Sequence, residues 1–181
     1  MSRINLVDPA EATGEARDAL SQIKSAFGVT PNMFRAAANS PAALKSMWGA
    51  FGALGGGVLD AKLGEQIAVA IADIDRCDYC LSAHTLLGQK AGATAQEMAE
   101  AQAGRSADPR TAAVLAFAVK VVRDRAQISD ADVSALREQG LDDEAIVEVI
   151  AHIALNLFTN YLNVALDVPV DFPGVRLRPA A

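Results

Sequence analysis

Signals that start and stop helices recur along the whole sequence, and they constrain its fold more than any other feature. Residues that can cap a helix N-terminus precede apolar segments at Ser40, Asp60, Thr94, Asp108 and Asp142. Glycines that can end a helix follow such segments at Gly28, Gly92 and Gly140. No alternating run of β-branched residues is long enough to form a strand. The sequence therefore predicts an all-α protein, folded as a compact bundle of helices.

The same signals give approximate bounds for individual helices. The first is expected to run from Pro9 to Phe27, the second from Pro31 to Asn39, and a later one from Cys77 to Ala91. The last and longest is expected from Asp142 to Leu166, followed by an extended tail with three prolines. Connections are short and no Ser- or Pro-rich linker interrupts the chain. We therefore expect one domain over residues 1–181, with its core motif region at about 40–125.

Composition narrows the range of partners. Hydrophobic residues make up 51% of the chain but aromatic residues only 5%, which suits close packing of helices rich in Ala, Leu, Val and Ile. A mean hydropathy of +0.19 indicates that other subunits cover part of the apolar surface, so we expect a homo-oligomer. The net charge is -6, so the chain lacks the excess of Lys and Arg that a protein surface needs to bind nucleic acid. We therefore do not expect nucleic acid as a partner.

Neither an export signal nor a membrane span is expected. Residues 1–8 contain no basic segment followed by an apolar run. Lys120 interrupts one apolar stretch, and Glu148, His152 and Asn156 interrupt another. We therefore expect no membrane association and a cytoplasmic location. In that compartment two cysteines three positions apart do not form a disulfide scaffold, and the pair indicates redox chemistry or metal binding.

One short segment, Cys77–His84, concentrates the reactive side chains. On a helix, Cys80 lies three residues after Cys77 and four before His84, so we expect all three side chains on one face. A cysteine attacks only as a thiolate, and a nearby imidazole or the amides of a helix N-terminus can stabilise that anion. The Cys-x-x-Cys spacing also lets one sulfur resolve a sulfenic acid on the other by forming a disulfide. These are the steps of a two-cysteine peroxidase.

This segment is part of a longer pattern. Glu65 lies twelve residues before Cys77 within Gly64–Ala68, and Gly92 follows the motif Cys77-x-x-Cys80-x-x-x-His84. Ser40-Pro41 upstream and Asn160-x-x-Asn163 in the last helix are less specific parts of the same pattern. The pattern, which extends from about residue 30 to about residue 170, resembles the alkylhydroperoxidase D-like branch of the carboxymuconolactone decarboxylase family.

The resemblance implies an all-helical fold that assembles into trimers or hexamers. It implies a thiol peroxidase of the antioxidant, alkyl hydroperoxide reductase type. In such an enzyme Cys80 would react with an organic hydroperoxide, and Cys77 would then form a disulfide with the oxidised Cys80. Glu65 and His84 would form the proton relay. The reductant would be a dithiol such as a dihydrolipoyl protein, and no metal or bound organic cofactor is implied.

Two features separate this chain from parts of that family. Peroxidase members carry a histidine between the cysteines, where this chain has Tyr79. A phenol with a pKa of about 10 is a poor base at neutral pH. Decarboxylase members generally lack the cysteine pair, so its presence argues against lactone decarboxylation. A decarboxylase-like enzyme acting on a small lactone or keto acid stays an alternative, as does a redox-sensing or zinc-binding module.

Other roles are open for the same residues. The two cysteines and His84 could ligate zinc with Glu65, His152 or water as the fourth ligand, although structural zinc sites usually take ligands in two separated pairs. The last helix carries polar residues at helical spacing: His152, Asn156, Asn160 and Asn163. Because buried amides need partners, we expect these residues to form a hydrogen-bond network at a subunit interface and to have no catalytic role.

Overall fold

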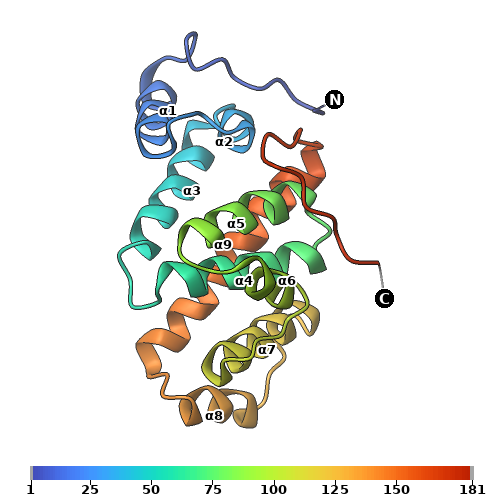
Figure 1. Cartoon of the computed structure of the whole chain (residues 1–181). Coiled ribbons are helices and arrows are strands. Elements are labelled where there is room, and N and C mark those ends of the chain that lie inside the picture. Colours follow the sequence, from blue (N-terminus) through green and yellow to red (C-terminus); the bar gives the residue numbers. More distant parts are fainter. Residues whose placement is uncertain (1, 180–181) are drawn as a thin grey trace.

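The protein is all-helical, as its capping signals predict (Figure 1). The computed structural model describes residues 2–179, which contain nine α-helices and no β-strand. In chain order the helices are α1 (Gly14–Phe27), α2 (Asn32–Ala37), α3 (Pro41–Leu54), α4 (Ala61–Ile74), α5 (Asp78–Lys90), α6 (Ala95–Gln102), α7 (Pro109–Arg123), α8 (Asp130–Glu138) and α9 (Asp143–Leu166).

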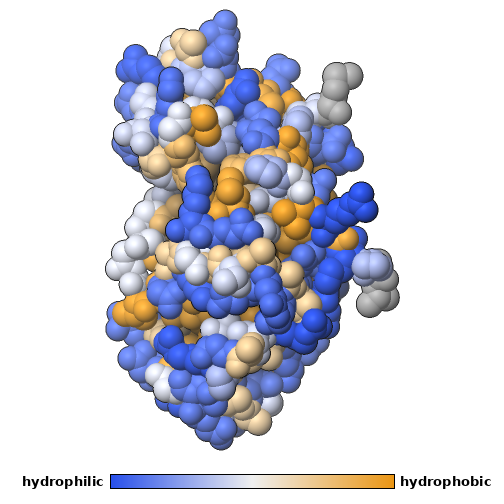
Figure 2. All heavy atoms as spheres, in the orientation of Figure 1, coloured by the Kyte–Doolittle hydropathy of each residue, from blue (hydrophilic) through white to orange (hydrophobic). Residues whose placement is uncertain are grey.

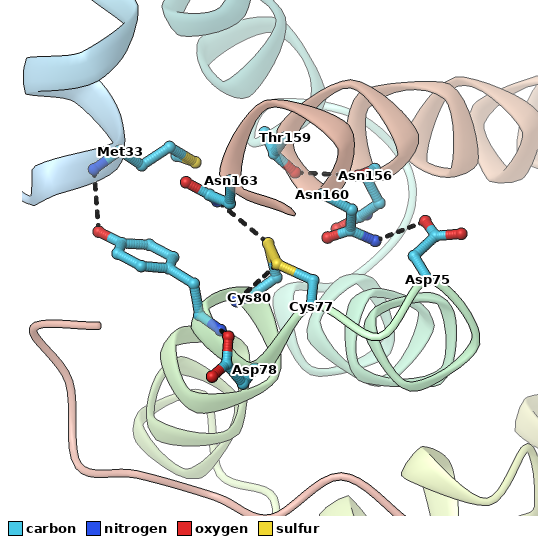
Figure 3. Close-up of a disulfide and its surroundings, with 10 residues drawn as sticks. Met33, Asp75, Cys77, Asp78, Cys80, Asn156, Thr159, Asn160 and Asn163 are labelled. Atoms are coloured by element: carbon cyan, nitrogen blue, oxygen red, sulfur yellow. Dashed lines mark hydrogen bonds between the residues drawn. A yellow bond between two sulfur atoms is a disulfide. The ribbon is translucent and has the colours of Figure 1, made fainter. Parts of the chain in front are cut away.

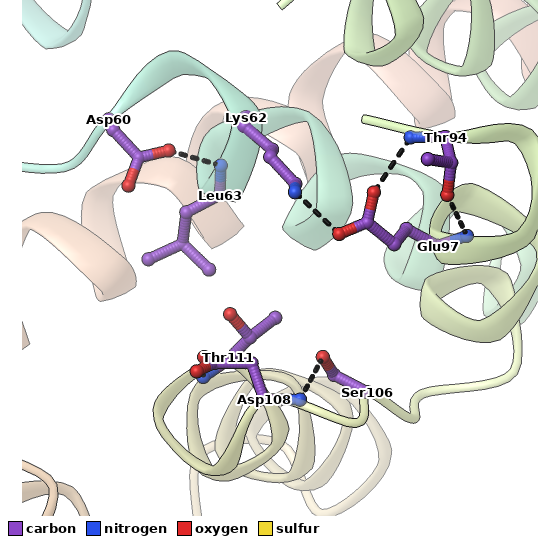
Figure 4. Close-up of polar contacts among 8 residues, drawn as sticks. All are labelled: Asp60, Lys62, Leu63, Thr94, Glu97, Ser106, Asp108 and Thr111. Atoms are coloured by element: carbon purple, nitrogen blue, oxygen red, sulfur yellow. Dashed lines mark hydrogen bonds and ion pairs between the residues drawn. The ribbon is translucent and has the colours of Figure 1, made fainter. Parts of the chain in front are cut away.

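Side-chain caps start the helices at the predicted positions. The side chains of four N-cap residues each accept a backbone N–H from the residue three positions on: Ser40, Asp60, Asp108 and Asp142. Thr94 and Glu97 form a reciprocal capping box, which Figure 4 shows beside the caps of α4 and α7. Each cap satisfies an N–H that the helix cannot pair internally, a contribution of about 1 kcal/mol.

The first helix is shorter than predicted. It begins at Gly14 and not at Pro9, because Asp8 organises a turn before it: the Asp8 side chain accepts the N–H of Ala10 and the Asp8 carbonyl accepts the N–H of Ala12. Gly14 itself has a φ of +57°, in the left-handed region, so a right-handed helix cannot continue backwards through it. The predicted end of this helix at Gly28 is confirmed, with a φ of +77°.

α4 is the central helix of the bundle. It packs against α5, α6, α7 and α9, while α1–α3 lie at one end of the molecule and α7 and α8 at the other (Figure 1). Its side chains are buried on nearly all sides, including Leu63, Ile67, Val69 and Ile71. A helix buried on most of its circumference is stabilised mainly by packing against its neighbours. This position makes α4 the rigid support for the start of α5, where the two cysteines lie.

α9 is long and apolar enough, by length and composition alone, to cross a membrane, so the expectation that no segment reaches that length was wrong for this helix. No other helix in residues 2–179 passes that test. In this fold α9 packs against α2, α3, α4, α5 and α7. Its amide side chains Asn156, Asn160 and Asn163 are buried within the chain. It is therefore a core helix of the bundle, which accounts for its apolar composition.

Replacement of Ile71 by Ala is expected to lower the free energy of unfolding by about 3 kcal/mol, because Ile71 is fully buried on the central helix α4 and its removal leaves a cavity. Ile74→Ala is the matched control, since Ile74 ends the same helix and is only partly buried, and it should cost about 1 kcal/mol or less. Urea unfolding followed by circular dichroism measures both. Equal losses for the two variants would contradict the central position of Ile71.

Candidate active site

The chain reverses direction between α4 and α5, and this reversal places the cysteines. Asp75 ends α4, and Arg76 adopts a φ of +59°, in the left-handed region. The backbone N–H of Cys77 then donates to the carbonyl of Ala72. As a result Cys77 is the N-cap of α5, one residue outside the helix, and not a helical residue as the sequence predicted. Its sulfur accepts the backbone N–H of Cys80 at 3.2 Å.

Cys77 and Cys80 are joined by a disulfide bond across the first turn of α5 (Figure 3). Their Cα atoms are 5.3 Å apart, within the usual range for bonded cysteines. Cys77 is 0% exposed and Cys80 is 2% exposed. The predicted juxtaposition of the two sulfurs is therefore present. Because both lie at the N-terminus of α5, unpaired helix amides favour a thiolate at this site after reduction.

Asn163 of α9 contacts the Cys80 sulfur directly, a contact that sequence reasoning missed. Its side-chain N–H donates to Cys80 Sγ at 3.2 Å, and Asn160 one turn earlier donates to Asp75 Oδ2 at 2.9 Å (Figure 3). Asn160 and Asn163 are 0% and 3% exposed, so they do not lie at a subunit interface as expected. Their spacing on the last helix was the available signal. An amide donor pointing at sulfur favours the thiolate over the thiol.

Glu65 and His84 form a hydrogen-bonded pair that joins α4 to α5. Glu65 Oε2 and His84 Nδ1 are 2.6 Å apart, and the His84 side chain is 11% exposed. An ionised carboxylate can only accept, so it holds the proton on Nδ1 and leaves Nε2 free to accept a proton from another group. His84 lies four residues after Cys80 on the same helix. Glu65 therefore orients His84 as it would orient a catalytic base.

Two hollows meet at this pair, and His84 lines both of them. The hollow on the cysteine side is almost entirely apolar and is lined by Cys80 and His84 together with Phe27, Pro31, Met33, Phe34, Phe51, Tyr79, Ala83, Leu87 and Phe172. Cys77 does not line it. The hollow on the other side is more polar, and its ionisable lining residues are Asp60, Glu65, His84 and His152. Cys80 is thus the sulfur that faces an apolar binding space.

Tyr79, which lies between the two cysteines, holds neighbouring segments together. It is 2% exposed, and its hydroxyl oxygen accepts the backbone N–H of Met33 at 3.1 Å. Burial raises the pKa of Tyr79 far above its usual value, and its hydrogen bond to Asp171 also raises it. The phenol therefore stays protonated at neutral pH and cannot act as a base, as the sequence predicts.

His152, a candidate zinc ligand, lies on the far side of Glu65 from the cysteines. Its ring packs against Gly64, where an added Cβ would lie 3.1 Å from His152 Cε1. Its Nε2 atom is buried without a hydrogen-bond partner in the described part of the chain. Residues 2–179 contain no group of three or more His, Cys, Asp or Glu side chains arranged to hold a metal ion. The zinc alternative therefore has no assembled ligand set in this fold.

His152 gives the fold a predictable sensitivity to acid. Burial lowers its pKa, and this outweighs the neighbouring charges of Glu148 and Glu65, which raise it. Because the pKa of His152 is lower in the folded state, the unfolded state binds the proton more readily. The stability that neutral His152 contributes is therefore present above its unfolded pKa of about 6.5 and is lost as the pH falls through its folded pKa. His152→Gln should therefore lose less unfolding free energy than the wild type between pH 7.5 and 5.5 in urea titrations. An equal or larger loss in the variant would contradict this assignment.

Comparison with known proteins agrees with this fold and motif. The carboxymuconolactone decarboxylase family profile matches residues 40–118. The structure is similar to the alkylhydroperoxidase AhpD core of an uncharacterized peroxidase-related protein from Ralstonia eutropha JMP134, with 24% identity and a TM-score of 0.84 over 94% of this chain and 92% of that one. It is also similar to an uncharacterized peroxidase-related protein from Silicibacter sp. TM1040, with 24% identity and a TM-score of 0.81 over 93% and 91%.

A third similar structure is a cysteine-to-alanine variant of the debrominase Bmp8 in complex with 2,3,4-tribromopyrrole, with 20% identity and a TM-score of 0.78 over 94% of each chain. No curated protein matches the sequence. The segment that the family profile covers contains α3 to α6, the cysteine pair and the Glu65–His84 pair. Residues 40–118 therefore resemble the carboxymuconolactone decarboxylase family, and the fold is similar to that of the alkylhydroperoxidase AhpD core.

Proposed function

We propose that the protein is a two-cysteine thiol peroxidase that reduces organic hydroperoxides. The observation that carries this proposal is the arrangement of one wall of the apolar hollow. That wall holds Cys80, one of two cysteines joined in a disulfide, and His84, which Glu65 orients. Nucleophile, base and orienting carboxylate follow the general logic of an activated nucleophile.

The first step forms a sulfenic acid on Cys80. In the reduced protein His84 Nε2 accepts the Cys80 proton, and the helix N-terminus and the Asn163 amide stabilise the thiolate. The thiolate attacks the terminal oxygen of the hydroperoxide, the O–O bond breaks, and the sulfur is oxidised to the sulfenic acid. The departing alkoxide takes a proton from His84 and leaves as the alcohol.

The second step closes the disulfide. The Cys77 thiol attacks the Cys80 sulfenic acid, and the hydroxyl leaves as water, which restores the bonded state of Figure 3. Two thiols of an external dithiol then reduce the disulfide by exchange, through a mixed disulfide. The overall change converts one hydroperoxide and one dithiol into an alcohol, water and a new disulfide. A dihydrolipoyl group or another protein dithiol has the required chemistry.

We also propose that the protein is a homo-oligomer that acts in the cytoplasm. α9 exposes Val147, Ile150, Phe158, Tyr161 and Val164, with exposed fractions from 38% to 65%. Contiguous apolar surface of this kind is typical of contacts between subunits. A reducing compartment would supply the dithiol that regenerates the enzyme.

Lactone decarboxylation is less well supported than peroxide reduction. A small lactone or keto acid with carboxylate groups needs cationic partners when it is buried. In the described part of the chain neither hollow is lined by Lys or Arg. Thiol-dependent dehalogenation of a small aromatic compound fits the apolar hollow better, since a debrominase shares the fold. It is the second candidate.

The deciding experiment treats the reduced, metal-free protein with one equivalent of ethyl or cumene hydroperoxide and follows both thiols by mass spectrometry. Formation of an intramolecular Cys77–Cys80 disulfide within seconds, with one alcohol released per disulfide, supports the peroxidase. If neither hydroperoxide oxidises the thiols over minutes, the peroxidase proposal fails. A parallel reaction with 2,3,4-tribromopyrrole tests dehalogenation, where released bromide is the product to measure.

A further inference from the structure

The chain after α9 forms an extended segment, residues 168–179, that we call the C-terminal strap. It contains no helix or strand, and Figure 1 shows it running from the end of α9 down one side of the molecule. Hydrophobic residues gather near the middle of the face shown in Figure 2, around α5 and the strap, whereas the end formed by α7 and α8 is largely hydrophilic. The strap therefore covers the part of the molecule that contains the apolar hollow.

Hydrogen bonds fix the first part of the strap to the segment that starts α2. The backbone N–H of Asn32 donates to Asp171 Oδ2 at 2.8 Å, and the Asn32 side chain donates to the carbonyl of Pro169 at 3.1 Å. Asp171 is also close enough to the Tyr79 hydroxyl to raise the pKa of Tyr79. The residues just before Phe172 are thus held against the start of α2.

The rest of the strap is fixed to α5 and α4. The backbone N–H of Val175 donates to Ser82 Oγ at 3.1 Å. Arg178 donates to Asp73 twice, from its backbone N–H to Oδ1 and from Nε to Oδ2, each at 3.0 Å. Burial raises the pKa of Asp73, but the hydrogen bonds from Arg178 and Gln102 outweigh it and lower the pKa below its usual value. Asp73 is therefore an ionised anchor for the end of the strap.

Between these anchors Phe172 forms one wall of the apolar hollow. Its ring meets the Tyr79 ring edge to face, with centroids 5.6 Å apart and an interplanar angle of 85°. The remaining walls come from helices and their short connections, which the bundle holds in place. Cys80 is only 2% exposed at the base of the hollow. Apart from Pro31 in the short connection between α1 and α2, Phe172 is the lining residue that lies outside a helix.

We propose that Phe172 is a specificity-determining residue, which limits the size of the apolar molecule that can reach Cys80. Small alkyl hydroperoxides fit beside its ring, whereas bulky aromatic hydroperoxides require its displacement. The choice of hydroperoxide rests on the proposed function, but the size limit at the Cys80 sulfur does not, because it applies to any reagent that enters the hollow.

The test measures alkylation of Cys80 by two reagents with the same reactive carbon and different bulk, iodoacetamide and iodoacetanilide. The protein carries Cys77→Ser, so that Cys80 is its only thiol. Phe172→Ala should raise the rate with iodoacetanilide at least about tenfold and the rate with iodoacetamide less than about threefold. Phe172→Trp should slow iodoacetanilide further, so the two variants should shift the ratio of rates in opposite directions.

Val170→Ala is the matched control, because Val170 lies on the strap, is 38% exposed and does not line the hollow. It should leave the ratio unchanged. A ratio that is the same in the wild type, Phe172→Ala and Phe172→Trp would overturn the proposal. A shift in the same direction for both variants would also overturn it, since that result indicates general loosening of the strap.

Oxidation by hydroperoxides separates this proposal from the proposed function. With Cys77 present, Phe172→Ala should raise the ratio of the cumene to the ethyl hydroperoxide rate about tenfold. If no hydroperoxide oxidises Cys80 but the alkylation ratios shift as expected, the peroxidase proposal fails and the size limit stands. If hydroperoxides oxidise Cys80 but neither ratio depends on residue 172, the size limit fails and the peroxidase proposal stands.

Discussion

Replacement of Cys80 by Ser is expected to reduce hydroperoxide consumption to the background rate, a loss of at least about a thousandfold, because a serine hydroxyl supplies no thiolate at neutral pH. Cys80 is the cysteine that lines the apolar hollow and accepts the Asn163 hydrogen bond. Stopped-flow measurement of the first turnover, with reduced protein and no added dithiol, isolates this step from the regeneration of the enzyme.

Cys77→Ser is the matched variant, since it removes a sulfur from the same disulfide by the same substitution. It should keep the first oxidation and accumulate a sulfenic acid on Cys80, which dimedone traps and mass spectrometry locates. Cys77 is fully buried and does not line the hollow, so it is not placed to meet the hydroperoxide first. The opposite pattern, with sulfenic acid on Cys77 in the Cys80→Ser protein, would contradict the assigned roles.

Most of the fold could be predicted from local signals. A cap at Asp60 or Asp142 fixes a helix start through hydrogen bonds within one turn, so it can be recognised without tertiary contacts. The start of α1 could not be predicted in this way. There Asp8 favours a turn, and the left-handed backbone of Gly14 has no sequence signal that distinguishes it from other glycines.

The local part of the site could also be predicted from sequence. The proximity of Cys77 and Cys80 follows from their spacing, and in the structure a disulfide bond joins them. The family resemblance predicts Glu65, whereas a glutamate in an alanine-rich helix has no distinguishing local signal. The structure places Glu65 Oε2 2.6 Å from His84 Nδ1. The catalytic roles of these residues stay predictions that the experiments above test.

Contacts between segments that are distant in the sequence could not be predicted from it. The contact of Asn163 with Cys80 depends on how α9 crosses α5, and its spacing on the last helix fits a subunit interface equally well. The strap depends on long-range hydrogen bonds such as that from Val175 to Ser82. A proline-containing tail predicts extended backbone but not the surface on which it lies.

Replacement of Glu65 by Gln is expected to slow Cys80 oxidation by hydroperoxide about a hundredfold, the usual scale for loss of a general acid–base function. The Gln side-chain oxygen can still accept the His84 Nδ1 hydrogen bond, so the ring keeps its orientation. A neutral amide cannot stabilise the imidazolium that His84 must form in order to give a proton to the departing alkoxide. The effect should therefore fall on proton transfer and leave the fold intact, which circular dichroism checks.

Alkylation by iodoacetamide separates this role from a purely structural one. Peroxide reduction needs a proton for the departing alkoxide, whereas iodide leaves without one, so Glu65→Gln should slow alkylation by less than about tenfold. Glu144→Gln is the control, because Glu144 is an exposed glutamate in the first turn of α9 and lines neither hollow. It should change neither rate. A proton relay must affect hydroperoxide reduction, which consumes a proton, more strongly than alkylation, which does not. Equal slowing of the two reactions in Glu65→Gln would therefore contradict the relay and show that Glu65 only positions the thiol.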